Sequence, residues 1–485
     1  MTLLFNSLQF IFVFFPIVSI IFWLLRSKKQ RYWWLALAGY VFYGLWDYRF
    51  APLLFATTVF NFLAAKLIFR NKEIESKENA EKNAESKARK NKKIILVVAI
   101  IVNLGLLGFF KYFNFASSML NQLATIFNLS LNSPILSLIL PLGISFYTFQ
   151  SISYILDVSS GKIKPAASLL EFICYMSLFP QLVSGPIVRY SEISQSLDNI
   201  DKVDNSRFVK GVNLFVFGLA KKIMLADTIA MFINPMLSGY SSLTTFTAWA
   251  AVLGYSFQLY FDFSGYTDMA LGLACFFGFD LPINFNSPFK ALNLSDFWRR
   301  WHMSLTRWVN DYLFLPLTTS GKKGISKAKI LGATIITMFL LGLWHGAGLT
   351  FLAFGLYHGI LIVMYHLTKK WYDLLPKLIR RIITFVLIVI GFLIFRSDSF
   401  SMLLAILGKM FAFTGGLPFF EIRIVILLLL IAASAFISFF LKNTNQLNYL
   451  PKKQYIIYAI ILALLLVISI VALGRAEVAF LYYQF

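Results

Sequence analysis

The chain has 485 residues, of which 59% are hydrophobic, 17% aromatic and only 14% charged. Soluble domains carry roughly 25% charged residues, so this composition excludes an ordinary cytosolic enzyme. The 44 Lys and Arg exceed the 22 Asp and Glu by 22, which in a membrane protein first indicates cytoplasmic loops rather than a nucleic-acid surface. Because Cys174 and Cys275 both lie in apolar runs, neither a disulfide framework nor a thiolate metal site is expected.

Apolar runs of about 20 residues, long enough to cross a bilayer, recur along the chain. The first, near 8–25, has no basic region before it, so we expect a retained helix rather than a signal peptide. The basic loop 26–31 places this side in the cytoplasm and the N-terminus outside. Spans near 32–46 and 50–69 then lead to the charged segment 70–93, expected to be a solvated cytoplasmic loop.

The spans continue through the middle of the chain with one interruption. Those near 94–115 and 136–157 enclose an uncharged loop rich in Asn and Ser, which is expected outside. Two prolines and a glycine break the run 166–186, which indicates a re-entrant loop. Two further spans follow, near 212–232 and 249–279.

Charged residues lie inside these last two spans. Lys221 and Lys222 are expected to line a cavity or to mark a break in their helix, because charges at membrane depth face protein or water. Asp262 and Asp268 need partners for the same reason. One interpretation pairs them with these lysines or with an arginine such as Arg299. The other has them orient a catalytic histidine.

The segment 286–329 is basic and amphipathic, so we expect it to face the cytoplasm. Within it Ser295 is expected to cap a helix on which Trp298 and the tryptophan three residues later form one aromatic face. Such a helix should lie in the membrane interface. Arg299 and Arg300 would then meet lipid phosphates or the phosphates of a cytoplasmic acyl donor.

His345 is the strongest candidate for chemistry among only four histidines. It lies 16 residues beyond Lys329, about 24 Å up the first helix of an expected hairpin that returns near 369–370. An imidazole at that depth indicates function, and the alternative is a hydrogen-bonded packing residue. Gly342, Gly346 and Gly348 are expected to lower the side-chain wall beside the ring and let a substrate approach it.

The other three histidines carry weaker signals. His302 is a second candidate, because a tilted interfacial helix would bring it under His345. His358 and His366, towards the cytoplasmic end of the returning helix, are expected to pack or to face the interface. No metal-ligand spacing, phosphate loop or nucleophile elbow occurs in the sequence.

Spans near 382–395, 424–441 and 455–473 bring the count to eleven to thirteen transmembrane or re-entrant helices. The sequence therefore predicts an all-α polytopic membrane protein with one membrane domain, 1–474. An aromatic tail, 475–485, is expected on the external face. No internal repeat of fixed period occurs, so an inverted-repeat transporter gains no support.

Five motifs together resemble the membrane-bound O-acyltransferase superfamily, in the bacterial branch of the alginate O-acetyltransferase membrane subunit and the peptidoglycan O-acetyltransferase A proteins. They are LPLGISFYTF (140–149), SGPI (184–187), YFDFSGY (260–266), FWRRWH (297–302) and LWHG (343–346). The resemblance implies an MBOAT-like helical bundle around a central acyl-transfer tunnel. It places the catalytic region at 286–369.

The resemblance also implies roles for individual residues. His345 matches the catalytic histidine of the superfamily, and His302 matches a second active-site position. The tail FLYYQF (480–485) is similar to tails in which a tyrosine is proposed to carry the acyl group, which points to Tyr482. The residues expected to bind or orient the donor are Trp298, Arg299, Arg300, Trp344, Asp262 and Asp268.

Two departures from the family pattern bear on these roles. Many relatives have a Gly-Gly turn where this chain reads LPLTTSG (315–321), which leaves the shape of the donor entrance open. Leu481 and Tyr483 differ from the commoner tail, so Tyr483 is a rival acyl carrier.

The resulting hypothesis is a membrane O-acetyltransferase in the cell (inner) membrane. It would use cytoplasmic acetyl-CoA as donor, with no permanently bound cofactor and no metal. An external SGNH or esterase-like partner would acetylate a cell-wall polysaccharide, with peptidoglycan favoured and alginate or another exopolysaccharide as the alternative. The rival classes are a transporter or flippase of an acylated carrier, which breaks no bond, and a scaffold that only recruits the external enzyme.

Overall fold

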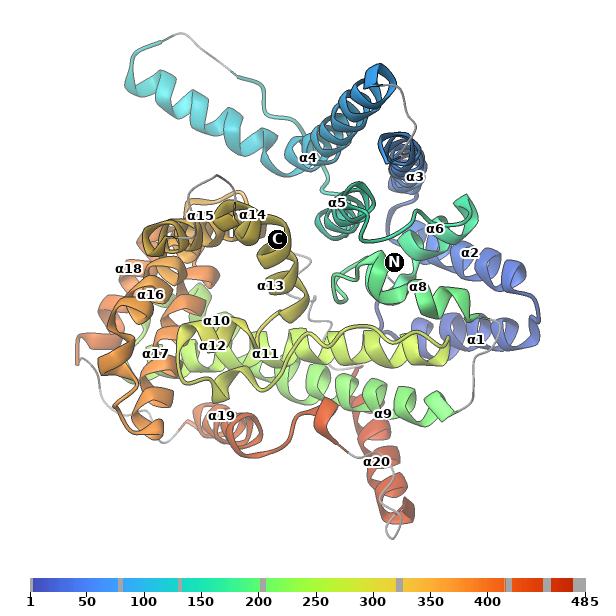
Figure 1. The fold of residues 1–485 in the computed structure, drawn as a ribbon. Coiled ribbons are helices and arrows are strands. Elements are labelled where there is room, and N and C mark those ends of the chain that lie inside the picture. The colour runs from blue at the N-terminus through green and yellow to red at the C-terminus, as the bar shows by residue number, and fades with distance from the viewer. Residues whose placement is uncertain are drawn as a thin grey trace. The chain divides into compact units, whose positions relative to one another are not determined.

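The structure is a computed structural model that describes residues 3–76, 82–129, 133–200, 206–319, 326–413, 415, 421–447 and 455–473. These residues form helices joined by turns and extended segments, and they include no strand. The all-α prediction is therefore confirmed for the described part of the chain. Two compact units are present (Figure 1): Met1–Phe208 with Leu273–Pro282, and Val209–Gly272 with Ile283–Phe485.

The first unit contains eight α-helices and two short segments of other helical type among its described residues. These are η1 (Phe10–Phe14), α1 (Phe15–Leu24), α2 (Lys28–Asp47), η2 (Tyr48–Phe50), α3 (Ala51–Glu75), α4 (Lys82–Ile126), α5 (Ile144–Ser160), α6 (Leu169–Ser177), α7 (Phe179–Leu182) and α8 (Tyr190–Asp198). The two short helices α6 and α7 occupy the run in which a re-entrant loop was expected. Gly143 is the N-cap residue of α5 and has a φ of 69°. A Cβ added there would lie 2.3 Å from the carbonyl oxygen of Leu182.

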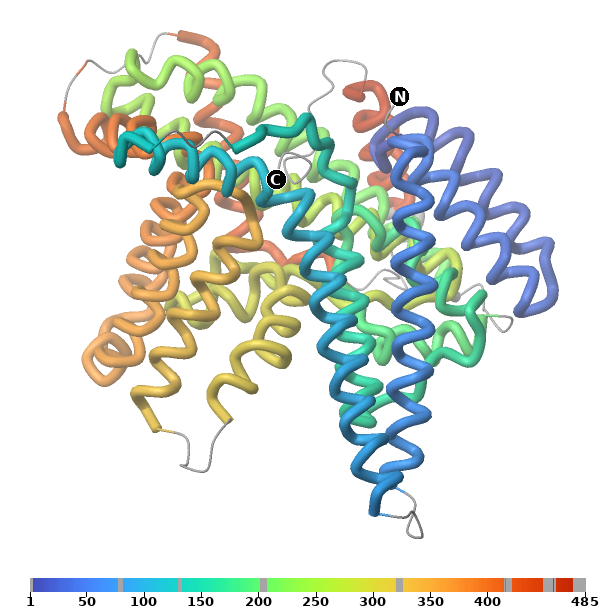
Figure 2. Tube along the Cα trace, turned by 90° about the horizontal axis from the view of Figure 1, so that it is seen from above, coloured from blue at the N-terminus to red at the C-terminus, as the bar shows by residue number. Residues whose placement is uncertain are grey.

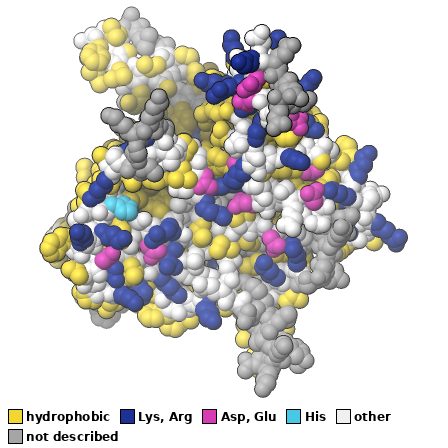
Figure 3. All heavy atoms as spheres, viewed as in Figure 1, with side chains coloured by type: hydrophobic (Ala, Val, Ile, Leu, Met, Phe, Trp, Pro, Cys, Tyr) yellow, Lys and Arg dark blue, Asp and Glu magenta, His cyan; other side chains and the backbone are white. Residues whose placement is uncertain are grey.

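Helices α3 and α4 run side by side (Figure 2), and their ends carry the charged residues of the expected cytoplasmic loop. Glu75 forms an ion pair with Lys92 across the two helices. Figure 3 shows Lys and Arg gathered over this end, next to hydrophobic surface. Further along α4 the apolar side chains are exposed, such as Ile101 at 63%, which is typical of a surface that faces lipid.

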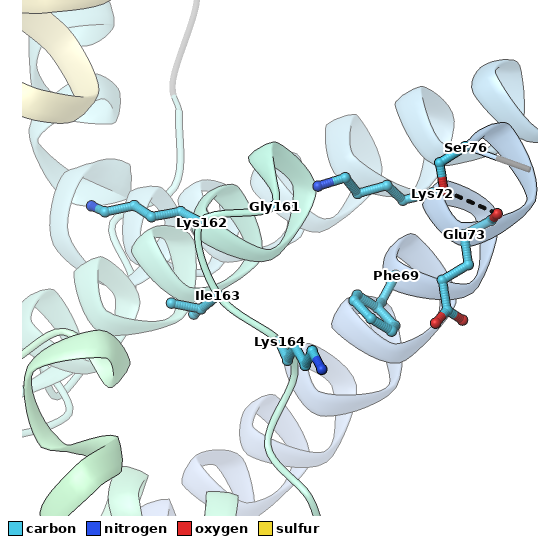
Figure 4. Close-up of a pocket in the computed structure, with 8 residues that line it drawn as sticks. All are labelled: Phe69, Lys72, Glu73, Ser76, Gly161, Lys162, Ile163 and Lys164. Carbon is cyan, nitrogen blue, oxygen red and sulfur yellow. Dashed lines mark hydrogen bonds between the residues drawn. The ribbon is translucent and has the colours of Figure 1, made fainter.

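A pocket lies in the first unit where the C-terminal end of α3 meets the segment after α5 (Figure 4). It is lined by Phe69, Lys72, Glu73, Ser76, Gly161, Lys162, Ile163 and Lys164. Lys162 lies 3.5 Å from the carboxylate of Asp157, and Lys72 extends towards Gly161. None of the site residues expected from the sequence lines this pocket.

The second unit holds the segments that carry the expected chemistry. Its helices are α9 (Ser206–Ala220, which begins in the first unit), η4 (Lys221–Asp227), α10 (Thr228–Ser238), η5 (Tyr240–Ser242), α11 (Thr245–Phe276, which ends in the first unit), η6 (Pro288–Lys290), α12 (Leu294–Trp298), α13 (Met303–Val309), η7 (Asn310–Phe314), α14 (Leu315–Thr319), α15 (Lys327–His345), α16 (Leu349–Tyr372), α17 (Lys377–Arg396), α18 (Phe400–Phe411), α19 (Ile422–Phe440), η8 (Thr444–Gln446) and α20 (Tyr455–Leu473). Helices α15 and α16 form the expected hairpin, and α17 packs against α16. The expected break at Lys221 and Lys222 appears as a π-helical segment, η4.

Six stretches of the described chain are long and apolar enough to cross a membrane. They are Lys28–Glu75, Lys82–Ile126, Lys327–His345, Leu349–Tyr372, Lys377–Arg396 and Ile422–Phe440. Helix α11 is not among them, because buried polar residues such as Gln258 and Asp262 interrupt its apolar side chains. The chain is thus a membrane protein whose inner helices are more polar than its lipid-facing ones.

Candidate active site

His345 is the last residue of α15, a helix that begins where the Ser326 side chain accepts a hydrogen bond from the backbone N–H of Lys329. The chain leaves the helix at once through Gly346, whose backbone is extended. The imidazole is 4% exposed. Its ring lies against Trp344, at 4.9 Å between centroids, and against Phe395, at 5.2 Å. A ring held by aromatic neighbours in this way has a fixed orientation.

His302 reaches the same part of the second unit from a connection between two short helices. It follows α12 and precedes α13, and its φ of 45° and ψ of 52° lie in the left-handed region. That conformation is uncommon for a residue with a side chain. The ring is fully buried and packs edge to face on Phe263 of α11, at 4.8 Å.

Trp344 brings the two histidines into one site. Its indole lies 6.2 Å from the His302 ring and 4.9 Å from the His345 ring. All three side chains belong to the second unit. The arrangement places two imidazoles, the side chains most often used as general acids and bases, against one indole.

Asn284 supports His302 from the extended segment before η6. Its Oδ1 lies 3.2 Å from Nδ1 of His302, and it accepts hydrogen bonds from the backbone N–H and the hydroxyl of Ser304, at 3.1 and 2.9 Å. The Asn284 carbonyl oxygen also accepts from the backbone N–H of Met303, at 2.9 Å. The side chain of Asn284 is itself fully buried.

Burial lowers the pKa of His302 from 6.5 to about 3. The physical cause is desolvation, which disfavours the charged imidazolium in an environment without water. The ring is therefore neutral throughout the physiological pH range. A neutral imidazole has one N–H donor and one acceptor nitrogen.

The expected interfacial helix around Trp298 is wrong in two respects. Asn293 rather than Ser295 is the N-cap, since its Oδ1 accepts from the N–H of Asp296 at 2.7 Å. The helix ends after five residues instead of running on to His302. Trp298 is 5% exposed, because its indole packs inside the protein rather than in lipid headgroups.

Arg299 and Arg300 both lie beside Asp296. The Nε of Arg300 is 3.0 Å from the Asp296 carboxylate, and Nη2 of Arg299 is 3.7 Å from it. The Arg299 side chain is 69% exposed, so its guanidinium faces the surroundings, whereas Arg300 also donates to the carbonyl oxygen of Asn286. Of the two, Arg299 has the greater access to a ligand from outside.

Asp262 and Asp268 form ion pairs with Lys222 and Lys221, as the first of the two interpretations predicted. Asp262 lies 2.6 Å from the ammonium of Lys222, which also contacts Asp227 at 2.6 Å. Asp268 lies 2.5 Å from Lys221. Their alternative role, orienting a catalytic histidine, stays a prediction.

Gly342 and Gly346, beside His345, do not open space for a substrate. A Cβ on Gly342 would lie 2.3 Å from the carbonyl oxygen of Phe351, and one on Gly346 would lie 2.2 Å from the Phe351 ring. The expectation was wrong because these positions are occupied by α16. The glycines allow the backbones of α15 and α16 to pack closely.

His358 has the packing role expected for it. It is fully buried in α16, and its Nδ1 accepts from the indole N–H of Trp298 at 3.4 Å. His366, further along the same helix, is exposed. Tyr482 and Tyr483 lie outside the described residues.

The sequence reasoning missed Asn284 and Ser304. The only local signal for Asn284 is its position in an apolar stretch, between Ile283 and Phe285, where a polar side chain that is buried needs hydrogen-bond partners. Within the described part of the chain, no group of three or more His, Cys, Asp or Glu is arranged to hold a metal ion.

Comparison with known proteins gives consistent matches. The model of the MBOAT, membrane-bound O-acyltransferase family matches residues 42–405. The chain is 37% identical over 450 residues to the peptidoglycan O-acetyltransferase of Helicobacter pylori, covering 85% of this chain and 80% of that protein. It is 34% identical over 415 residues to the probable alginate O-acetylase AlgI of Pseudomonas aeruginosa, with 85% and 75% covered. The teichoic acid D-alanyltransferase of Bacillus subtilis is 31% identical over 273 residues, with 53% and 69% covered.

Proposed function

Because the chain belongs to the MBOAT, membrane-bound O-acyltransferase family, we propose that this membrane O-acyltransferase takes acetyl groups from acetyl-CoA on the cytoplasmic side and passes them to an acceptor on the external side. The final product is an O-acetylated polysaccharide of the cell wall. An external esterase-like partner carries out the last transfer. The donor is a substrate, and no resident cofactor takes part.

In this mechanism His345 is the general base. It removes the proton from the hydroxyl of Tyr482, whose ordinary pKa of about 10 makes it a poor nucleophile at neutral pH. The phenolic oxygen attacks the thioester carbonyl, the C–S bond breaks, and an acetyl-tyrosine ester forms. The proton on His345 then passes to the departing CoA thiolate, so that the histidine is regenerated.

His302 orients the thioester beside His345. Trp344, which touches both rings, closes the site between them. Arg299 binds the phosphates of CoA, because its guanidinium is exposed and guanidinium geometry matches that of phosphate. Asp262 and Asp268 support the site indirectly, by holding η4 against α11 through Lys222 and Lys221.

The observation that carries the proposal is the convergence of His302 and His345 on Trp344. The two residues are 43 positions apart in the chain, and the fold brings both rings against one indole. A buried imidazole costs free energy unless it is hydrogen-bonded, and ionisable groups buried in membrane proteins commonly have a functional role. Acyl transfer is a use that this family membership supplies.

Peptidoglycan is the proposed acceptor polymer. A relative with that named activity is 37% identical to this chain, against 34% for the probable alginate O-acetylase of P. aeruginosa, so alginate or another exopolysaccharide is the second candidate. Deletion of the gene should remove acetyl esters from one of these polymers only. Loss from an exopolysaccharide with intact peptidoglycan acetylation would transfer the proposal to that acceptor.

Substitution of the base tests the chemistry. With purified protein and acetyl-CoA, His345→Ala should lower the rate of CoA release by about 10²–10⁴-fold, because it removes general-base catalysis. His366→Ala is the matched control, since His366 is exposed on α16, and it should retain the wild-type rate. A flippase would release no CoA even as wild type. A scaffold would release none either, but would lose its external partner on removal of the tail.

A further inference from the structure

The side-chain amide of Asn284 can adopt only one orientation. The backbone N–H of Ser304, 3.1 Å away, is always a donor, so the Asn284 atom that faces it must be the carbonyl oxygen Oδ1. If the amide were turned over, its NH₂ group would face that N–H and the two donors would repel. The Ser304 hydroxyl, which donates to the same oxygen at 2.9 Å, reinforces this orientation.

The orientation of Asn284 determines which nitrogen of His302 carries the proton. Oδ1 is an acceptor, and Nδ1 of His302 lies 3.2 Å from it. A contact at that distance is a hydrogen bond only if Nδ1 is protonated. With Nδ1–H in place, the neutral ring has its lone pair on Nε2, since a neutral imidazole holds one proton on its two nitrogens.

We propose that Asn284 is a positioning residue of the acyl-transfer site, which fixes His302 in the Nδ1–H tautomer so that Nε2 faces the substrate as a hydrogen-bond acceptor. This inference rests on the proposed function, because it assigns a task to one of the two histidines of that site. The tautomer itself is a property of the resting protein. It is therefore testable without turnover.

The tautomer restricts what His302 can do. In this form Nε2 cannot donate a hydrogen bond to the oxygen of a thioester carbonyl or of a developing oxyanion. It can accept one, for instance from an amide N–H of the pantetheine arm that carries the acetyl group. His302 would thus align the donor, and the electrophilic stabilisation has to come from other groups.

The amide nitrogen of Asn284 offers a further contact for a substrate. Its amide nitrogen is buried and has no hydrogen-bond acceptor among the described residues. An amide N–H pair left in that state costs free energy, and a carbonyl oxygen of a bound substrate would satisfy it. One asparagine beside His302 thus offers an acceptor to the ring and a donor pair to a ligand.

The choice of an asparagine is chemically specific. A carboxylate at position 284 would also accept from Nδ1–H, but its charge would favour the imidazolium and leave no acceptor on Nε2. A leucine of similar size would leave Nδ1 without this acceptor. A hydrolase triad gives the scale of such an effect. When the carboxylate that orients its histidine is exchanged for an amide, the histidine takes the wrong tautomer and kcat falls by about 10⁴-fold.

The tautomer can be read directly by solid-state NMR of protein labelled with ¹³C,¹⁵N-histidine in lipid bilayers. Only four histidines contribute signals, and the spectrum of His302→Gln identifies those of His302. We expect a protonated Nδ1 and an unprotonated Nε2 at pH 7. A wild-type spectrum with the proton on Nε2 would overturn the proposal, whatever the activity of the protein.

Variants separate positioning from simple packing. Asn284→Leu should shift the proton of His302 from Nδ1 into a mixture and lower the kcat of CoA release by about 10²-fold or more. In Asn284→Asp, Nδ1 of His302 should stay protonated, because the carboxylate also accepts from it. The matched control is Asn103→Leu, which removes a buried asparagine that bonds Asn61 in the first unit and should leave the His302 signals unchanged.

The outcomes keep this inference apart from the proposed function. An unchanged tautomer in Asn284→Leu would refute the positioning role even if activity fell. A wild-type protein that has the expected tautomer but releases no CoA would refute the proposed function and leave the role of Asn284 in the fold intact.

Discussion

His302 and His345 reach Trp344 along different backbone paths. His345 ends a regular helix, so helical hydrogen bonds fix its position. His302 adopts a left-handed conformation, which costs a residue with a Cβ about 1–2 kcal/mol. The hydrogen bonds of Asn284 to Met303 and Ser304 offset that cost. Strain of this kind is concentrated at functional sites, in agreement with the role proposed for His302.

The burial of His302 predicts a pH dependence of stability. Its pKa is about 3 in the folded protein against 6.5 ordinarily, so below pH 6.5 the unfolded chain binds a proton that the folded chain does not. Stability present above pH 6.5 is therefore lost as the pH falls towards 3. The thermal midpoint of the detergent-solubilised protein should fall between pH 7 and pH 5, and His302→Gln should reduce this fall. An equal fall in the variant would contradict the assignment.

At the residue scale, the histidines could be picked out from the sequence, but the side chain that hydrogen-bonds His302 could not. His345 could be singled out because histidine is rare in this chain and its position implied membrane depth. Asn284 could not be, because its function depends on Met303 and Ser304 lying against it. Such pairing of two extended or turn segments leaves no periodic pattern. The roles of His302, His345 and Tyr482 themselves remain predictions.

Helices α9 and α11 approach each other through glycines in the second unit. A Cβ on Gly218 would lie 2.5 Å from the carbonyl oxygen of Gly265, and a Cβ on Gly265 would lie 2.7 Å from that of Gly218. This close approach sets the two helices at the distance at which Lys221 and Asp268, on the following turns, form their ion pair. The elements behind His302 are thus held by backbone contact as well as by charge.

A methyl group at Gly218 should disrupt this contact. Gly218→Ala places a Cβ where backbone atoms already lie, and overpacking of this kind costs about 1–3 kcal/mol. The matched control is Gly332→Ala on α15, where a Cβ would meet nothing within 4 Å; it should gain about 0.5–1 kcal/mol. Thermal unfolding in detergent measures both variants, and a Gly218→Ala protein as stable as the wild type would show that α9 and α11 can separate.

The helices were easier to predict than their ends. Apolar runs located α15, α16, α17 and α19 within a few residues, because each has a long stretch that meets lipid on one side. The prediction for the segment around Trp298 was wrong, because an aromatic pair at i,i+3 spacing predicts an amphipathic surface helix. In the structure Trp298 and Trp301 are both buried by tertiary packing. The left-handed backbone of His302 prevents one continuous helix through this segment.

The whole chain separates lipid-facing from protein-facing helices by composition. Only 17% of the most apolar part of α4 is buried, against 44% for α15. Helix α11 carries buried Gln258, Asp262 and Asp268, because side chains enclosed by protein can pair with one another and lipid-facing ones cannot. Among the described residues, six stretches are long and apolar enough to cross a membrane. This is fewer than the eleven to thirteen transmembrane or re-entrant segments expected from the sequence, because inner helices such as α11 carry polar side chains.

In the proposed function, one chain accepts an acetyl group on one side of the membrane and presents it on the other. Sidedness and covalent transfer are both properties of the complete molecule, so proteoliposomes of the full chain are the appropriate sample. The donor should be supplied on a single side, and the protein should be recovered for peptide analysis.

The decisive measurement is mass spectrometry of the C-terminal peptide after proteoliposomes receive ¹³C-acetyl-CoA on the side that carries the charged segment 70–93. We expect one labelled acetyl ester on Tyr482, absent when the donor is on the opposite side and absent in His345→Ala. Label on Tyr483 alone would move the carrier by one residue. CoA release without any acetyl group on the tail would rule out Tyr482 and Tyr483 as acyl carriers, and labelling that persists in His345→Ala would rule out His345 as the general base.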